Sequence, residues 1–121
     1  MILVDTSVWV DHLRRPDLDL ARALSAGQVL THPFVIGEIA LGALAQRDQT
    51  LRNLKRLPCV VVATDAEVWS LIESERLFGI GVGYVDAHLL AAARLTPGTL
   101  VWTRDRRLAR VVAQLGLAPS P

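Results

Sequence analysis

The chain has 121 residues, of which 51% are hydrophobic, and it carries 13 Lys and Arg against 12 Asp and Glu. This length fits a single globular domain that buries about two thirds of the surface of its unfolded chain, without room for a second domain. No apolar stretch reaches the roughly 18 residues of a membrane-spanning helix, and the N-terminus lacks a signal-peptide pattern. We therefore expect a cytoplasmic protein with no membrane segment.

Short apolar runs rich in β-branched residues alternate along the chain with segments of helical periodicity. The apolar runs predict four strands covered on both faces, at residues 1–4, 28–31, 59–62 and 99–102, with a weaker fifth strand near Leu117. Apolar residues spaced three and four apart predict helices over residues 7–13, 18–25, 33–45, 49–57, 65–78, 84–95 and 105–115.

Several helix boundaries carry their own signals. Pro33 suits a first helical position, Thr64 and Glu67 have the spacing of a capping box, and Gly27 and Gly116 suit helix ends. Because parallel strands need crossover connections, the alternation predicts the α/β class: one domain over residues 1–121 with a mostly parallel sheet of four to five strands and helices on both faces. Residues 118–121 are expected to fray.

Four acidic residues stand at the margins of apolar segments. Asp5 ends the run MILV, Glu38 lies inside FVIGEIALG, Asp86 lies inside GVGYVDAHLLAAA, and Asp105 follows TLVWTR. Burying an unpartnered carboxylate costs several kcal/mol, so four at such positions indicate one shared divalent cation. In α/β folds, ligands bind beyond the carboxyl ends of the strands, which is where Asp5 and Asp105 are expected.

Each acid also has a purely structural interpretation. Asp5 could cap the helix that follows it, Asp105 could favour the positive end of the next helix dipole, and Asp86 could be an ordinary acid of a first helical turn. Glu38 is the hardest to explain in this way, because its neighbours three and four residues away are Phe34, Val35, Leu41 and Gly42.

The basic residues matter once these acids are set aside. Removing the four acids leaves 13 bases against 8 acids, a balance of +5, and all the bases but one are Arg. The planar Arg fork suits phosphate oxygens, so this grouping is compatible with a polyanionic substrate, although the bases of residues 52–56 fit a solvated helix face better.

Four blocks together carry a resemblance to a known family. ILVDTSVWVDHL, PFVIGEIALGAL, GYVDAHLLAAA and LVWTRDRRLAR resemble, in order and over nearly the whole chain, the PIN-domain ribonucleases, specifically the VapC-type toxins of toxin–antitoxin pairs. The resemblance implies that Asp5, Glu38, Asp86 and Asp105 are the catalytic and metal-binding acids. It also implies that Thr6 and Thr103 are small polar residues beside the metal.

The resemblance further implies an activity and partners. We expect an endoribonuclease that uses one or two Mg²⁺ or Mn²⁺ ions and leaves 5′-phosphate and 3′-hydroxyl ends. Asp5, Asp86 and Asp105 would be the main ligands, and Glu38 would bind a second ion or orient the water. The expected partners are RNA, a VapB-type antitoxin and a second copy of the chain in a homodimer.

Two further sets of residues are candidates for binding. Arg104, Arg106 and Arg107 flank Asp105, and at least one of them is a candidate to hold RNA phosphate. The alternative is that these arginines simply face solvent. Trp9, Val10 and Leu13 cannot all face one core from a short helix, which predicts an apolar partner surface for the antitoxin. The alternative is that Trp9 packs inside the domain.

The remaining features of the sequence do not predict a catalytic role. The lone Cys59 is expected to be a small buried side chain, and His12, His32 and His88 have no zinc-site spacing and are expected at the surface or an interface. The glycines at 79, 81 and 83 predict a flexible turn that lets the Asp86 helix approach the acids.

Two rival functions remain open. One is a phosphoacceptor receiver-like domain, which needs an acidic pair after its first strand and a suitably placed lysine. The other is a non-catalytic RNA- or protein-binding module in which the acids hold a structural ion.

Overall fold

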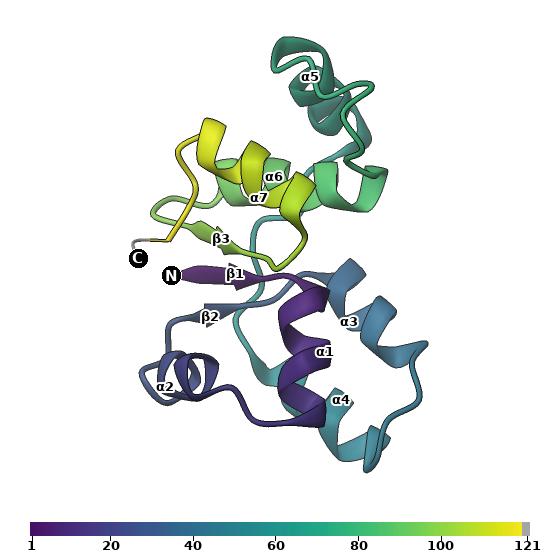
Figure 1. Ribbon diagram of the computed structural model, residues 1–121, viewed down its shortest axis with the longest axis vertical. Helices are drawn as coiled ribbons and strands as arrows, with labels where there is room; N and C mark the ends of the chain where they lie inside the picture. The colour runs from purple at the N-terminus through teal and green to yellow at the C-terminus, as the bar shows by residue number, and fades with distance from the viewer. Residues whose placement is uncertain (120–121) are drawn as a thin grey trace.

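The sheet at the centre of the molecule is parallel and has three strands. The computed structural model describes residues 1–119, and the last two residues of the expected frayed tail, Ser120 and Pro121, lie outside the described residues. Strands β1 (Ile2–Val4), β2 (Val29–Leu30) and β3 (Leu100–Trp102) are arranged in the order β2-β1-β3 (Figure 1). Since all three run in the same direction, their carboxyl ends share one edge, and β1 leads there into Asp5.

The expectation of four to five strands is wrong for the described residues. The segment at Cys59 makes only an isolated parallel bridge to Thr31, in which the Thr31 N–H bonds to the Pro58 carbonyl at 2.9 Å and the Val60 N–H bonds to the Thr31 carbonyl at 3.0 Å. The ladder stops there because α3 begins at Pro33, which has no N–H to donate. Leu117 accepts one hydrogen bond from the Val101 N–H at 2.8 Å, which brings it beside β3 without forming a ladder.

Seven helices surround the sheet in the described part of the chain. They are α1 (Thr6–Arg14), α2 (Leu18–Ser25), α3 (Pro33–Ala40), α4 (Arg47–Arg56), α5 (Asp65–Ser74), α6 (Tyr84–Leu95) and α7 (Arg106–Gln114). In Figure 1, α6 and α7 gather beyond β3, α1 to α4 gather beyond β1 and β2, and α5 stands at the far end. None of these helices is long and apolar enough to cross a membrane.

The expected boundary signals are present. Pro33 occupies the first turn of α3, and Thr64 and Glu67 form both hydrogen bonds of a capping box at 3.2 and 2.9 Å. Gly27 and Gly116 follow α2 and α7 with φ of 68° and 72°, the left-handed conformation that ends helices at glycine.

Two helices are shorter than their periodicity predicts. Helix α3 ends at Ala40 rather than at residue 45, and Leu41, which continues the apolar pattern, is 91% exposed and has no core to pack on. Helix α5 ends at Ser74 rather than at residue 78, because Arg76 adopts a left-handed φ of 54° and the Leu77 N–H turns back to the Ile72 carbonyl.

Helix α6 forms the middle of the core and fixes the place of Asp86. Every residue from 87 to 93 is buried, so this stretch of the helix is enclosed on all sides. His32 and His88 are buried as well, which corrects the expectation of surface histidines. The Nδ1 of His32 accepts the Phe34 N–H at 2.9 Å, so this ring is used as the N-cap of α3. Cys59, in contrast, is exposed, because the following Val60 takes the buried position.

Candidate acidic active site

The four predicted acids act on one another at the carboxyl edge of the sheet. Asp5 follows β1, Asp105 precedes α7, Glu38 lies in α3, and Asp86 lies in the first turn of α6. Burial raises the pKa of Asp86, and the negative charges of Asp5, Asp105 and Glu38 raise it further. Four elements distant in sequence therefore bring negative charge to one region.

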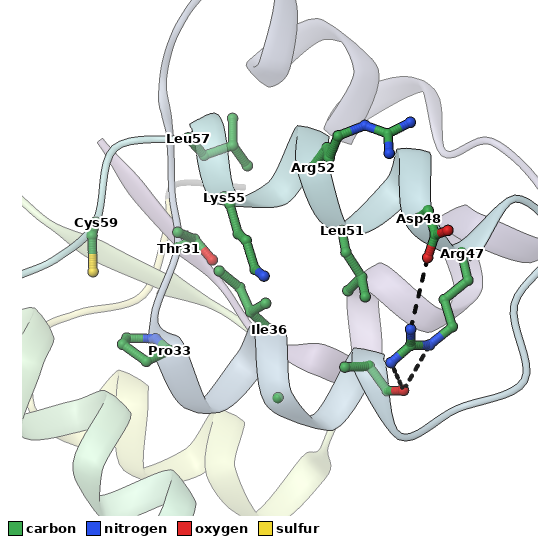
Figure 2. A pocket seen from close by; sticks show the side chains of 12 residues that line it. Thr31, Pro33, Ile36, Arg47, Asp48, Leu51, Arg52, Lys55, Leu57 and Cys59 are labelled. Atoms are coloured by element: carbon green, nitrogen blue, oxygen red, sulfur yellow. Dashed lines mark hydrogen bonds and ion pairs between the residues drawn. The ribbon is translucent and has the colours of Figure 1, made fainter.

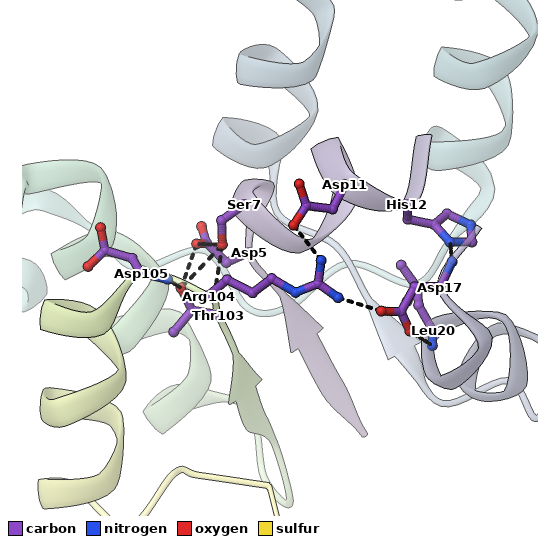
Figure 3. Close-up of polar contacts among 9 residues, drawn as sticks. All are labelled: Asp5, Ser7, Asp11, His12, Asp17, Leu20, Thr103, Arg104 and Asp105. Atoms are coloured by element: carbon purple, nitrogen blue, oxygen red, sulfur yellow. Dashed lines mark hydrogen bonds and ion pairs between the residues drawn. The ribbon is translucent and has the colours of Figure 1, made fainter. Parts of the chain in front are cut away.

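Asp5 is the most buried of the four acids and is held by hydroxyl groups. Its side chain is 7% exposed, and Oδ2 accepts hydrogen bonds from Ser7 Oγ and Thr103 Oγ1, both at 2.7 Å (Figure 3). Although Asp5 occupies the N-cap position of α1, its carboxylate accepts no backbone N–H there. The capping interpretation of Asp5 is therefore wrong, and its orientation is set by two hydroxyls.

Glu38 reaches the region from α3. Its Oε1 accepts a hydrogen bond from Thr6 Oγ1 at 2.7 Å, which links the start of α1 to the middle of α3. Glu38 is exposed, so the apolar neighbours expected around it do not enclose its carboxylate. Thr6 thus stands beside one acid and Thr103 beside another.

Asp86 and Asp105 each combine their place in the cluster with a role at a helix start. Asp86 is half-buried and its Oδ2 accepts the Gly83 N–H at 3.2 Å. Asp105 is exposed, its Oδ1 caps α7 by accepting the Leu108 N–H at 2.9 Å, and its own N–H bonds to Thr103 Oγ1 at 3.0 Å. Capping is therefore real for Asp105, and it orients the carboxylate without removing it from the cluster.

The four carboxylates share one further property. Each has one oxygen in a local hydrogen bond and a second oxygen without a hydrogen-bond donor among residues 1–119. Within the same residues, no group of three or more His, Cys, Asp or Glu side chains is arranged to hold a metal ion by itself. The acids thus form an open set of hard oxygen donors, which suits a cation that keeps several of its waters.

Comparisons with known proteins show the family of this chain. A family model for the PIN domain matches residues 2–114. The chain belongs to the PIN-domain family. It is also 47% identical over 118 residues to Ribonuclease VapC32 of Mycobacterium tuberculosis, in strains CDC 1551 / Oshkosh and ATCC 25618 / H37Rv, which covers 98% of this chain and 95% of that protein. The resemblance to VapC-type PIN-domain ribonucleases is confirmed.

The position of the single lysine argues against a receiver-like domain. Lys55 lines a groove of about 730 Å³ between α3 and α4, together with Arg47 and Arg52 and an apolar floor (Figure 2). None of the four acids lines this groove. A PIN-domain chain whose lysine lies away from its carboxylates lacks the pairing that phosphoacceptor chemistry needs.

The three arginines around Asp105 differ in their surroundings. Arg104 is exposed, but its guanidinium pairs with Asp11 and Asp17. Arg106 and Arg107 are exposed and make no side-chain hydrogen bond or ion pair with residues 1–119. Arg107 lies across Gly81, where an added Cβ would come within 2.5 Å of Arg107 Cδ. That one of the three arginines holds RNA phosphate stays a prediction, and the acidic partners of Arg104 favour Arg106 and Arg107 for this role.

The expected partner surface is smaller than predicted and reaches the acids. Trp9 is 4% exposed and packs edge-on against His12, so it belongs to the core and not to a partner surface. Val10 is exposed and Leu13 is half-buried, and both line a groove of about 520 Å³ that also includes Glu38. This groove, which mixes apolar and polar side chains, joins helix α1 to one of the four acids.

Sequence reasoning missed Ser7 as a member of the site. The Oγ of Ser7 donates a hydrogen bond to Asp5 Oδ2 at 2.7 Å and accepts one from the Arg104 N–H at 3.0 Å. The sequence signal that could have identified Ser7 is its hydroxyl, which lies two residues after Asp5 and in the first turn of α1. Asp11 and Asp17 were also missed, because both look like ordinary surface acids.

Proposed function

We propose that this PIN-domain protein is a divalent-metal-dependent endoribonuclease that acts as the toxin of a VapBC-type toxin–antitoxin pair. The observation that supports this proposal is that Asp5, Asp105 and Glu38 raise the pKa of Asp86 by their negative charge. Each of the four carboxylates also has one oxygen without a hydrogen-bond donor among residues 1–119. Nearly full-length similarity to a protein named as a ribonuclease supports RNA as the substrate.

Mg²⁺ or Mn²⁺, as one or two ions, fits this donor set because both prefer carboxylate oxygens and retain waters. Asp5, Asp86 and Asp105 would be the main ligands, and Glu38 would hold a second ion or orient the attacking water. When bound, such an ion supplies a water of lowered pKa and polarises the scissile phosphodiester. Ser7 and Thr103 fix the carboxylate of Asp5, and Thr6 fixes that of Glu38.

RNA binding is assigned to Arg106 and Arg107. Both lie in the first turn of α7, directly after Asp105, and neither has an anionic partner among the described residues. A cation without a partner beside the acids can bind a phosphate of the substrate strand and hold it near the carboxylates. We propose Arg107 as the stronger anchor, because packing against Gly81 fixes its side chain.

The antitoxin is assigned to the groove that contains Val10, Leu13 and Glu38. Its walls combine apolar side chains with Arg14, Gln46 and the proposed catalytic acid Glu38, so a segment of a VapB-type antitoxin that carries both apolar and polar groups could fill the groove and cover Glu38. Substituting Val10 by Glu should weaken antitoxin binding while leaving RNA cleavage by the free toxin intact.

For the homodimer we propose the face around Phe34 and Tyr84. Both rings are exposed, at 39% and 47%, and both contact the buried His88 ring, with centroids 4.8 and 4.7 Å apart. A second copy could cover these aromatic rings. Size-exclusion chromatography with light scattering should show a shift to monomer for Phe34→Glu.

Because RNA is the substrate, we place the activity in the cytoplasm.

The decisive experiment measures RNA cleavage by the wild type and by Asp5→Asn, with Mg²⁺ or Mn²⁺ and with chelator. The wild type should cleave only with metal. Asp5→Asn should lose at least about 100-fold, more than a residue that merely supports a ligand. Asp19→Asn, which changes an acid on the exposed face of α2, is the matched control and should cleave normally.

A thermal measurement accompanies this assay. Metal that binds only the folded chain raises Tm, and saturation at about 100 times Kd adds roughly 2.7 kcal/mol of stability. The wild type should show this rise and Asp5→Asn should not. RNA binding without metal-dependent cleavage by the wild type would instead favour a non-catalytic module with a structural ion.

A further inference from the structure

Arg104 joins three parts of the chain that are far apart in sequence. It lies between Thr103, which bonds to Asp5, and the capping residue Asp105. Its two terminal nitrogens point to different carboxylates, Nη1 to Asp11 in α1 and Nη2 to Asp17 at the start of α2 (Figure 3). A planar fork with donors on both arms is the side chain that can make this bridge.

The backbone of the same residue touches the acid site. The Arg104 N–H donates to Ser7 Oγ at 3.0 Å, and Ser7 Oγ donates to Asp5 Oδ2 at 2.7 Å. Arg104 therefore bonds to α1 twice, near its start through Ser7 and one turn later through Asp11. These two attachments fix both the position and the direction of the segment at residues 103–105.

The carboxylates that hold Arg104 are themselves fixed. Asp17 caps α2, since its Oδ1 accepts the Leu20 N–H at 3.0 Å, and its own N–H donates to His12 Nδ1 at 2.9 Å. The hydrogen bond from the Leu20 N–H lowers the pKa of Asp17, and Arg104 lowers it further, so the carboxylate stays charged. Asp17 is also the more buried of the two partners, with 19% of its side chain exposed against 50% for Asp11.

We infer that Arg104 is a positioning residue for the acid site, which clamps residues 103–105 onto α1 and α2 and thereby sets Asp105 relative to Asp5. This inference rests on the proposed function only where it speaks of catalysis. Ion pairs at the surface contribute little to stability, so the value of the clamp lies in geometry. A small misplacement of catalytic groups lowers the rate far more than it lowers stability.

The test compares Arg104→Lys, Arg104→Ala and the double variant Asp11→Asn/Asp17→Asn. Lysine keeps the charge but cannot bridge two carboxylates with a planar fork, and Asn at position 17 can still cap α2. Arg22→Ala, which removes an exposed ion pair within α2, is the matched control. The readouts are kcat and KM for RNA at saturating Mn²⁺, the Mn²⁺ half-saturation, and amide hydrogen exchange by NMR.

If Arg104 is a clamp, all three variants lower kcat by about tenfold to 100-fold with KM nearly unchanged, and Arg22→Ala has no effect. If Arg104 instead binds RNA, Arg104→Lys and Arg104→Ala raise KM, whereas the double variant frees the guanidinium and lowers KM. Unchanged kcat in the double variant overturns the inference.

Hydrogen exchange separates the clamp from the proposed function. The amides of Arg104 and Asp105 bond to the hydroxyls of Ser7 and Thr103, so they should lose protection in all three variants. Wild-type protein that does not cleave RNA refutes the nuclease and leaves this readout intact. Unchanged protection of both amides refutes the clamp whatever the activity. Should Arg104→Ala not fold, the other two variants carry the same test.

Discussion

Two segments deliver acids from the C-terminal half of the chain, and they are held in opposite ways. In residues 103–105 every residue makes a directional polar contact, from Thr103 to Asp5, from Arg104 to Ser7, and from Asp105 to Thr103. Residues 79–83, which lead to Asp86, contain three glycines, and their bond to the acid itself is the Gly83 N–H at 3.2 Å. Residues 103–105 are held by hydroxyl and charged groups, whereas residues 79–83 are held by packing against glycine backbone.

This difference predicts two kinds of sensitivity. The segment at 103–105 should be damaged by removing its polar groups. The glycine segment should be damaged by adding carbon atoms, because Gly79 and Gly81 have φ of 72° and 83° and Arg107 lies against Gly81. Few polar contacts also place the glycine segment among the parts of a fold that open most easily.

Thr103→Val should give the largest effect in the comparison. It removes the donor to Asp5 and the acceptor for the Asp105 N–H while keeping the volume of the side chain. Activity should fall by about tenfold to 100-fold, as for groups that orient metal ligands. Thr99→Val is the matched control, because the buried Thr99 Oγ1 has no hydrogen-bond partner among residues 1–119. Equal activity in the two variants would show that the hydroxyl of Thr103 is not needed.

Gly81→Ala tests the other segment, with Gly79→Ala as its control. Both place a Cβ on left-handed backbone, which costs about 1–2 kcal/mol, so both should lower Tm. A Cβ at Gly79 meets nothing within 4 Å, whereas one at Gly81 meets Arg107 at 2.5 Å. We expect Gly81→Ala alone to raise KM for RNA severalfold, by displacing Arg107. In an Arg107→Ala background this extra effect should vanish. If it persists, the glycine acts through something other than Arg107.

The two arginines on either side of Asp105 allow a smaller test of the same contrast. Arg107→Ala should reduce the slope of log affinity against log salt by about 0.7, as expected for one lost phosphate contact on a single strand. Arg104→Ala should leave this slope unchanged, because Arg104 is paired with Asp11 and Asp17. The measurement is RNA binding by catalytically inactive Asp5→Asn protein across a salt series. Equal slopes for Arg107→Ala and Arg104→Ala would mean that the two arginines contribute equally to phosphate binding.

The contrast also explains what the sequence could and could not predict. Asp5 and Asp105 were predicted at one edge because they follow apolar strands, and strand ends of a parallel sheet share an edge. The partners of Arg104 were not predictable in the same way. Asp11 and Asp17 lie 93 and 87 residues away, and no local pattern distinguishes an acid that faces solvent from one that meets a distant arginine.

Periodicity misled where tertiary contacts decide. The apolar spacing extended α3 through Leu41, yet a helix turn without a core to cover gains little, and α3 ends before it. The apolar run at residues 59–62 has strand composition, but Val61 bonds to a threonine hydroxyl and Cys59 faces outward. His32 and His88 are polar by type and buried by position, which one sequence does not reveal.

Asp86→Asn should give the smallest change among these tests, a shift in the Tm of the metal-free protein, and the sign of this shift is diagnostic. Burial and the other acids raise the pKa of Asp86 above its ordinary value of 3.8, so between that value and the raised pKa the native state binds more protons than the unfolded state. Stability contributed by this group therefore falls as pH rises through that window and stays low at neutral pH. Without metal, Asp86→Asn should raise Tm by a few degrees at pH 7 and leave Tm unchanged at pH 3.

The control and the metal response complete this argument. Asp48→Asn, at an exposed first-turn acid of α4, should not raise Tm, since Asp48 faces solvent beside Arg47 and favours the positive end of its helix. In excess Mg²⁺ the wild type should have the higher Tm of the two proteins. The Asp86 carboxylate, which destabilises the metal-free wild type, is then a metal ligand. An Asp86→Asn variant less stable than wild type without metal would mean that the hydrogen bond to Gly83 outweighs the repulsion among the acids. The glycine segment would then depend on the Asp86 carboxylate as much as the other segment depends on its hydroxyls.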